Sequence, residues 1–123
     1  MIKIIFCLRR LPSLSREAFH SYWLDKHAPL VREVAPTLRI RRYVQSHTLT
    51  DPRIQGAADV RGCGVDAYDG VAELWWDSVE DIMAASSSPE GRTAGRRLLA
   101  DEKNFIDLAN SSLFFARENE VLR

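Results

Sequence analysis

The chain has 123 residues, 46% of them hydrophobic, and its 17 basic and 17 acidic residues cancel at neutral pH. This length fits a single domain, residues 1–123, with enough apolar side chains for a real core. The balanced charge argues against nucleic-acid binding, and the locally basic run at residues 39–42 is better explained as a solvated strand end.

The first expected element is a β-strand at residues 2–8, a short apolar run rich in β-branched side chains. It is too short to span a bilayer, and charged residues follow it without a small-residue cleavage site, which argues against a membrane anchor or a signal peptide. Cys7 and Cys63 lack C-x-x-C spacing and give no reason to expect a disulfide. We therefore expect a cytoplasmic protein that does not bind membranes.

A helix is expected from Ser15, a good N-cap residue, to about residue 26. Phe19, Trp23 and His27 recur every four residues, so they lie on one face of this helix, the face toward the interior. The pattern places a titratable histidine beside a tryptophan in an apolar setting.

Pro29 is expected to interrupt this helix. Because it lacks a backbone N–H and its ring would clash with the carbonyl of Asp25, the helix should end or kink there and leave His27 at a break. A second short helical segment then covers residues 29–35, and Pro36 closes it. A histidine at a helix break is either a satisfied core residue, hydrogen-bonded to freed backbone, or part of a site.

The second strand is expected at residues 39–49. One of its faces carries four polar side chains: Arg41, Tyr43, Gln45 and His47. A phenol, an amide and an imidazole in a row can donate hydrogen bonds to a developing enolate or phenolate oxygen and can move a proton. The alternative is an ordinary polar face of an edge strand, which is the stronger explanation for Arg41 and the weaker one for His47.

Residues 50–67 show no periodicity, and a structureless loop of this length is usually a lid, a binding loop or a disordered segment. Four further elements are expected after it: a strand at residues 68–76, a helix opened by a capping box at residues 78–81, a longer helix through Phe105, and a last strand at residues 110–122.

The expected order is therefore β-α-β-β-α-β, the pattern of the ferredoxin-like α+β fold. It produces a four-stranded antiparallel sheet with helices on one face only. The uncovered face would expose aromatic side chains, and an apolar patch of that size marks an interface or a ligand groove. The simplest arrangement that covers it is a homodimer, sheet against sheet, about a two-fold axis.

Three segments of the chain carry a family resemblance. They are Phe19-x-x-Tyr22-Trp23-x-x-x-His27-Ala28-Pro29-Leu30, Tyr43-x-Gln45-x-His47, and Ala100-Asp-Glu-Lys-Asn-Phe-Ile-Asp107. They resemble the EthD family of the dimeric α+β barrel superfamily, over nearly the whole chain. The resemblance implies a homodimer with a pocket in each subunit, between the sheet and the helices or loops. Relatives include lactone isomerases, polyketide cyclases, monooxygenases and polyketide decarboxylases or dehydratases, most of which use no metal or organic cofactor.

His27, His47 and Tyr43 are the candidate catalytic residues. A histidine has an ordinary pKa of about 6.5, so small shifts suit it to proton transfer near neutral pH. The family motif favours a site role for His27 over a purely structural one. Gln45 and Arg41, on the same strand face as Tyr43, are candidates for binding the ligand.

Three further side chains are candidate substrate-binding residues. Glu73 lies between Val71 and Trp75 on one strand face, and a carboxylate among apolar neighbours has a raised pKa unless it is paired with a cation. Pairing with an arginine or exposure to solvent is the alternative for Glu73. Trp23 and Trp75 could line an aromatic pocket, because a flat substrate gains from offset stacking, although core packing is the commoner role.

No metal site or cofactor is expected, since the sequence lacks H-E-x-x-H, paired cysteines and a glycine-rich phosphate loop. Two functions remain open at this point. One is a cofactor-independent enzyme that moves protons on a small aromatic, polyketide or lactone-type molecule, by isomerisation, decarboxylation, dehydration or cyclisation. The other is a non-catalytic ligand-binding or accessory dimer of an oxidative degradation system.

Overall fold

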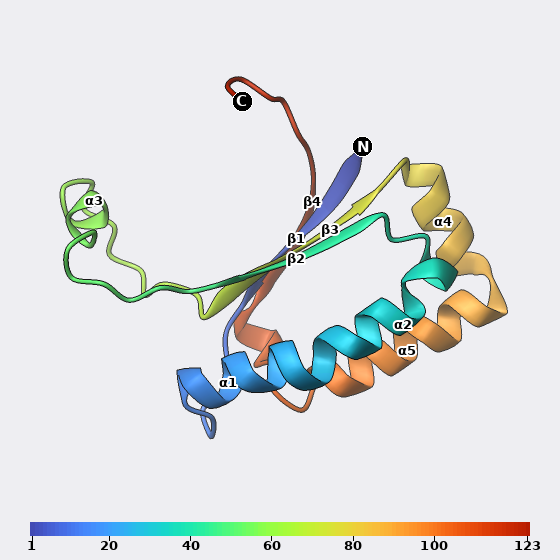
Figure 1. Ribbon diagram of the computed structural model, residues 1–123, viewed down its shortest axis with the longest axis horizontal. Coiled ribbons are helices and arrows are strands. Elements are labelled where there is room, and N and C mark those ends of the chain that lie inside the picture. The colour runs from blue at the N-terminus through green and yellow to red at the C-terminus, as the bar shows by residue number, and fades with distance from the viewer.

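The computed structural model describes all residues, 1–123, and shows an antiparallel sheet with helices packed on one face (Figure 1). The strands are β1 (Ile2–Leu8), β2 (Arg42–His47), β3 (Gly70–Trp76) and β4 (Ser112–Arg117). The larger helices are α1 (Arg16–Tyr22), α2 (Ala28–Leu38), α4 (Val79–Ser87) and α5 (Pro89–Glu102). Three short elements complete the chain: the π-helix η1 (Trp23–His27), α3 (Gly56–Asp59) and the 3-10 turn η2 (Leu108–Asn110).

The strand order in the sheet is β2-β3-β1-β4, and every neighbouring pair is antiparallel. With the helices in their places, this is the expected ferredoxin-like α+β fold. No helix is long and apolar enough to cross a membrane.

The helix does not end at Pro29, because helical geometry runs without interruption from α1 through η1 into α2. The turn before the proline is a π-turn, in which the N–H of Ala28 donates to the carbonyl of Trp23, five residues back. This wider turn relieves the demand for a regular i−4 bond at the place where Pro29 can supply none. The helix also passes Pro36 and ends where Arg39 adopts a left-handed conformation, with φ 61°.

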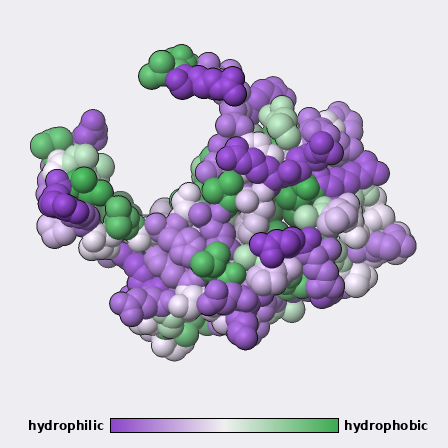
Figure 2. Space-filling view, in the orientation of Figure 1, coloured by the Kyte–Doolittle hydropathy of each residue, from purple (hydrophilic) through white to green (hydrophobic).

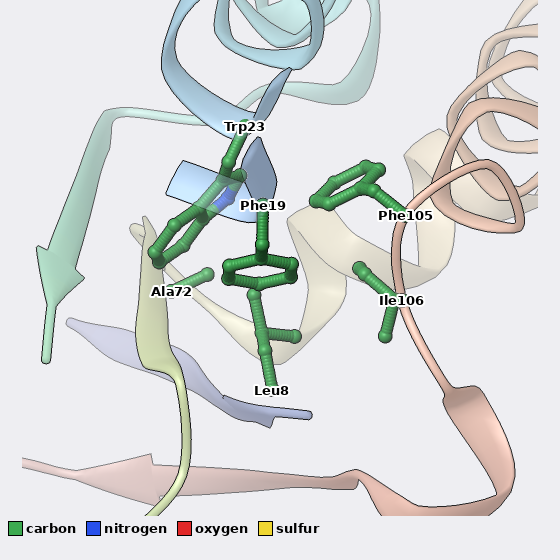
Figure 3. Packing of buried hydrophobic residues seen from close by; sticks show 6 residues of the cluster. All are labelled: Leu8, Phe19, Trp23, Ala72, Phe105 and Ile106. Atoms are coloured by element: carbon green, nitrogen blue, oxygen red, sulfur yellow. The ribbon is translucent and has the colours of Figure 1, made fainter. Parts of the chain in front are cut away.

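The core lies between the continuous helix and the sheet. In Figure 3, Phe19 and Trp23 point from the helix toward Leu8 and Ala72 of the sheet, while Phe105 and Ile106 close the cluster from the chain after α5. Gly70 permits this packing, because a Cβ at its position would collide with the Trp23 ring.

The loop predicted at residues 50–67 is not wholly structureless, because α3 forms within it. Figures 1 and 2 show this segment standing away from the body as an arm, on the far side of the sheet from α2 and α5. Its base is fixed by Arg9, whose guanidinium donates to the carbonyls of Asp66 and Ala67. None of its residues lines the cavity described below, so it is not a lid over that cavity.

Candidate functional site

A small cavity of about 40 Å³ lies between the sheet and the helices. Its sheet wall consists of Phe6, Leu8, Tyr43, Ala72 and Leu74. The opposite wall consists of Trp23, His27, Val31, Leu98 and Glu102 from the helices, and of Ile106 from the chain after α5. Three of these eleven residues, His27, Tyr43 and Glu102, carry groups that can exchange protons, and the rest of the wall is apolar apart from the indole N–H of Trp23.

His27 is only 5% exposed and forms a dyad with Asp101 of α5, because its Nδ1 lies 2.7 Å from the Asp101 Oδ2. Burial lowers the pKa of His27, and the nearby Asp101 only partly opposes that shift. Although burial acts in the opposite direction, hydrogen bonds from Tyr22, His27 and Asn104 hold the pKa of the Asp101 carboxyl below its usual range. An ionised carboxylate only accepts, so the Nδ1 of His27 carries the proton and its Nε2 is left as a base.

Glu102 is next to Asp101 in the chain, but its pKa is shifted in the opposite direction. Burial, and then the negative charge of Asp101, raise the pKa of Glu102 to about 7. No cation forms an ion pair with Glu102, and no side-chain hydrogen bond holds its carboxyl. Near neutral pH the cavity therefore contains a neutral imidazole and a carboxyl group that is about half protonated, so a base and an acid line the same space.

Tyr43, Gln45 and His47 form the hydrogen-bonded row that the alternation of β2 predicts. The Nε2 of Gln45 donates to the Tyr43 hydroxyl at 2.8 Å and to the Trp23 carbonyl at 2.9 Å. Its Oε1 lies 2.8 Å from the Nε2 of His47, which must therefore carry the hydrogen. Because the Tyr43 oxygen accepts from Gln45, its own O–H remains free to donate into the cavity.

Burial raises the pKa of Tyr43, against the hydrogen bonds from Gln45 and Trp23 that would favour its phenolate. Tyr43 is thus a neutral phenol with a fixed oxygen and a free donor hydrogen. It is placed to stabilise an oxyanion on a ligand.

Of the three candidate catalytic residues, His27 and Tyr43 line the cavity and His47 does not. Its ring stacks on Trp23 at 4.7 Å between centroids and packs against His20 at 4.5 Å. Burial, and then the charge of His20, lower the pKa of His47. His47 is connected to Tyr43 by two hydrogen bonds, through the side-chain amide of Gln45, and its contact with the row helps to orient that amide.

Glu73 and Trp75 lie on the opposite face of the sheet, because Ala72 and Leu74 of the same strand face the cavity. The Glu73 carboxylate pairs with the Lys3 Nζ at 2.6 Å. The Trp75 ring lies beneath the side chains of Lys3 and Arg42, and its indole N–H donates to Glu118. The structure thus separates both residues from His27, and the expected substrate-binding role has no support from their position.

Arg41 is not part of the Tyr43 row either, since β2 begins at Arg42. It borders a separate hollow that also includes Tyr43. Its side chain is 62% exposed and lies 3.8 Å from Asp77.

Asp101 and Glu102 were not among the residues predicted from the sequence, although both fall within the third family motif. A usable signal was present, because carboxylates in the last turn of a helix face the negative end of its dipole. The last turn of α5 holds these two acids and no basic residue. Acids in so unfavourable a position point to a role beyond helix stability.

No group of three or more histidine, cysteine, aspartate or glutamate side chains lies close enough to hold a metal ion. The polar groups of the cavity are matched instead to hydrogen bonding and proton exchange.

The fold and the cavity together define a ferredoxin-like α+β protein with an acid–base pair enclosed between its sheet and its helices. The EthD domain matches residues 11–109, and the chain belongs to the EthD family.

Two curated relatives are similar along most of the chain. Decarboxylase claH of Passalora fulva is 22% identical over 116 residues, which cover 93% of this chain and 73% of that protein. A decarboxylase of Claviceps purpurea is 23% identical over 112 residues, which cover 89% of this chain and 77% of that protein.

Solved structures share the fold. An EthD family protein of Bacillus halodurans matches with a TM-score of 0.63 and 22% identity, over 97% of this chain and 99% of its own. A hydroxynitrile lyase of Passiflora edulis matches with a TM-score of 0.60 and 16% identity, over 99% and 96%. A dimeric ferredoxin-like protein of Thermobifida fusca has a TM-score of 0.56 and 14% identity, over 95% and 90%.

Proposed function

We propose that the protein is a cofactor-independent lyase that moves protons on a small aromatic or polyketide-type molecule, and that decarboxylation is its reaction. The observation that carries the proposal is the pairing of His27, a neutral base, with Glu102, whose carboxyl has a pKa of about 7, in one cavity. The decarboxylase names of the two relatives support the choice of reaction.

In this scheme the substrate is a hydroxylated aromatic carboxylate. The Nε2 of His27 takes the proton of the ring hydroxyl, while Asp101 stabilises the imidazolium that forms. Tyr43 donates a hydrogen bond to the resulting oxyanion. The added electron density on the ring lets Glu102 protonate the carbon that bears the carboxylate.

The bond to the carboxylate then breaks and carbon dioxide leaves, which restores the aromatic ring. His27 returns its proton to the ring oxygen, and Glu102 takes a new proton from solvent. The net reaction consumes one proton and releases one carbon dioxide, without an oxidant or a metal.

The protein is also proposed to be a homodimer, with Phe114 of β4, which is 47% exposed, in the buried interface. The face of the sheet away from the helices has no cover within one chain, and the similar Thermobifida fusca protein is described as dimeric. The two free cysteines, Cys7 and Cys63, suit a cytoplasmic location.

Turnover is tested with a panel of hydroxylated aromatic carboxylates such as 1-hydroxy-2-naphthoate, by release of carbon dioxide. In D₂O, the vacated ring carbon should acquire deuterium, which NMR detects. His27→Gln serves as the matched control. Tight binding of these acids with no turnover on any of them would instead favour the ligand-binding dimer.

A further inference from the structure

A second hollow lies directly beside the cavity, between α2 and the start of the edge strand β2. We call it the outer hollow, and its volume is about 220 Å³. Val31 and Tyr43 line both spaces, so their side chains form the wall between the outer hollow and the cavity.

The size of the cavity indicates why the outer hollow matters. A single water needs about 10–15 Å³, so a space of about 40 Å³ holds no more than a few waters. An aromatic substrate must therefore extend beyond the cavity, and the outer hollow is separated from it by two side chains only.

The lining of the outer hollow combines an apolar floor with a basic rim. Ala28, Ala35 and Ile40 provide the floor, and Arg32 and Arg41 the rim. No acidic residue lines it, in a protein whose net charge is zero.

Both rim arginines are available to a ligand. Arg32 forms no ion pair, and the Nε of Arg41 is 3.8 Å from Asp77, beyond hydrogen-bond distance. Arg42 also borders the hollow, but its guanidinium stacks on Trp75 at 4.5 Å, on the outer face of the sheet.

We propose that the outer hollow binds an anionic group of the substrate, a carboxylate carried on an apolar ring, through Arg32 and Arg41. The ring then reaches past Val31 and Tyr43 toward His27 and Glu102. The two parallel N–H groups of a guanidinium match the two oxygens of a carboxylate. Because a guanidinium is weakly hydrated, removing water from it costs little free energy when the carboxylate binds. The bound group is not the one that reacts, because ion pairing with arginine stabilises a carboxylate against loss as carbon dioxide.

This inference rests on the proposed function, which places the reaction in the cavity. It adds that the substrate has two functional ends. One end is an anionic anchor at the surface, and the other is the reacting ring in the interior, which carries the separate carboxylate that leaves as carbon dioxide.

The test uses two probes of the same shape, naphthalene-1-carboxylate and the uncharged naphthalene-1-methanol, with binding measured by calorimetry at pH 7. The variants are Arg32→Gln, Arg41→Gln and the double variant, and the control is Arg96→Gln, an exposed arginine of α5 outside the outer hollow. Each rim variant should weaken carboxylate binding about tenfold, as expected for loss of one charge-assisted hydrogen-bonding partner near solvent. Binding of the alcohol should not change, and only carboxylate binding should weaken with added salt.

Equal binding of both probes by the wild-type protein would overturn the inference, as would equal losses in the rim variants and in Arg96→Gln. Ala35→Trp, which fills the floor of the outer hollow, should block both probes; undiminished binding to this folded variant would also overturn the inference.

The same measurements keep the two proposals apart. His27→Gln should bind naphthalene-1-carboxylate like the wild-type protein while losing turnover of the hydroxylated acids. Arginine-dependent binding without any turnover would refute the proposed reaction and leave the anion site standing. Turnover that depends on His27, combined with carboxylate binding that is unchanged in the arginine variants, would support the proposed reaction and refute the anion site.

Discussion

Two glutamates on opposite faces of the sheet show how a partner decides the chemistry of a carboxyl group. Glu73 on the outer face lies 2.6 Å from the Lys3 ammonium, and the two form a structural ion pair. Glu102 on the inner side lines a mainly apolar cavity without a cationic partner, and burial, followed by the negative charge of Asp101, raises its pKa to about 7. Both glutamates are partly enclosed, so burial alone does not separate them. Burial without a neighbouring cation is what makes Glu102 an acid that can give up a proton near neutral pH.

The largest expected effect on turnover comes from replacing His27, the proposed base on the inner side of the sheet. His27→Gln should lower the turnover rate by roughly a hundredfold to ten-thousandfold, as is usual for loss of a general base. The variant should remain a folded dimer, and thermal melting measured beside the rate shows whether it does. A variant that stays folded and fully active would remove His27 from the mechanism.

Glu102→Gln and Glu73→Gln make a matched pair that tests the comparison directly. Glu102→Gln should abolish most of the activity, and Glu73→Gln should leave it within about twofold, because only Glu102 lines the cavity.

Their stabilities should move in opposite directions. The pKa of Glu102 is raised on folding from 4.5 to about 7, so its stabilising contribution is present below pH 4.5 and is lost as the pH rises through about 7. Glu102→Gln should therefore raise the melting temperature at pH 8 and change it little at pH 4. Glu73→Gln should lower it slightly at pH 8, because Lys3 loses its partner. Identical melting shifts for the two variants would contradict this account.

The pH dependence of turnover follows from the same groups. On the acid side, activity should fall as His27 becomes protonated, and because burial lowers the pKa of His27 this fall lies at a more acidic pH than for an ordinary histidine. It should also fall above about pH 7 as Glu102 ionises. A rate profile that stays flat from pH 6 to pH 9 would exclude Glu102 as the acid.

A smaller effect is expected from Gln45→Glu, which keeps the shape of the side chain and removes its donor. The new carboxylate would accept the Tyr43 hydrogen, turn that donor away from the cavity, and face the Trp23 carbonyl without a hydrogen bond. We expect a loss of roughly a hundredfold in kcat, the size typical of losing one oxyanion donor. Ser46→Ala, the neighbouring exposed position, is the control. Tyr43→Phe should add nothing to the loss, and an additive double variant would contradict the row described above.

The smallest effect on chemistry is expected from the outer face. Phe114→Arg should shift the protein from dimer to monomer in light scattering, because Phe114 shares that face with Ile5 and Glu73 by the strand register. Turnover per subunit should change by less than about threefold, since no outer-face residue lines the cavity.

Much of this arrangement could be predicted from periodicity. The four-residue spacing of Phe19, Trp23 and His27 predicts the buried helix face, and the alternation along β2 predicts the Tyr43, Gln45 and His47 row. What periodicity does not carry is pairing between distant elements. Glu73 was separated from the cavity by the register of the sheet, and Asp101 was brought to His27 by packing of α5 across 74 residues of chain.

Local rules also failed where the backbone departed from its common form. The steric rule for Pro29 is sound for a regular α-helix, but the π-turn before it removes the condition on which the rule depends. Nothing in the sequence pattern distinguishes five residues that form a π-turn from five that form an α-turn.

The π-turn at Trp23–His27 makes this protein sensitive to the length of one segment as well as to the identity of its two end residues. Leu24 in that turn is 56% exposed, and its replacement by alanine should be tolerated. Its deletion would be different, because a π-turn holds one residue more than an α-turn. Losing that residue would return this turn to regular α-helical geometry, in which the Pro29 ring clashes with the backbone of the preceding turn. A deletion here should therefore destabilise the fold even though a substitution at Leu24 does not.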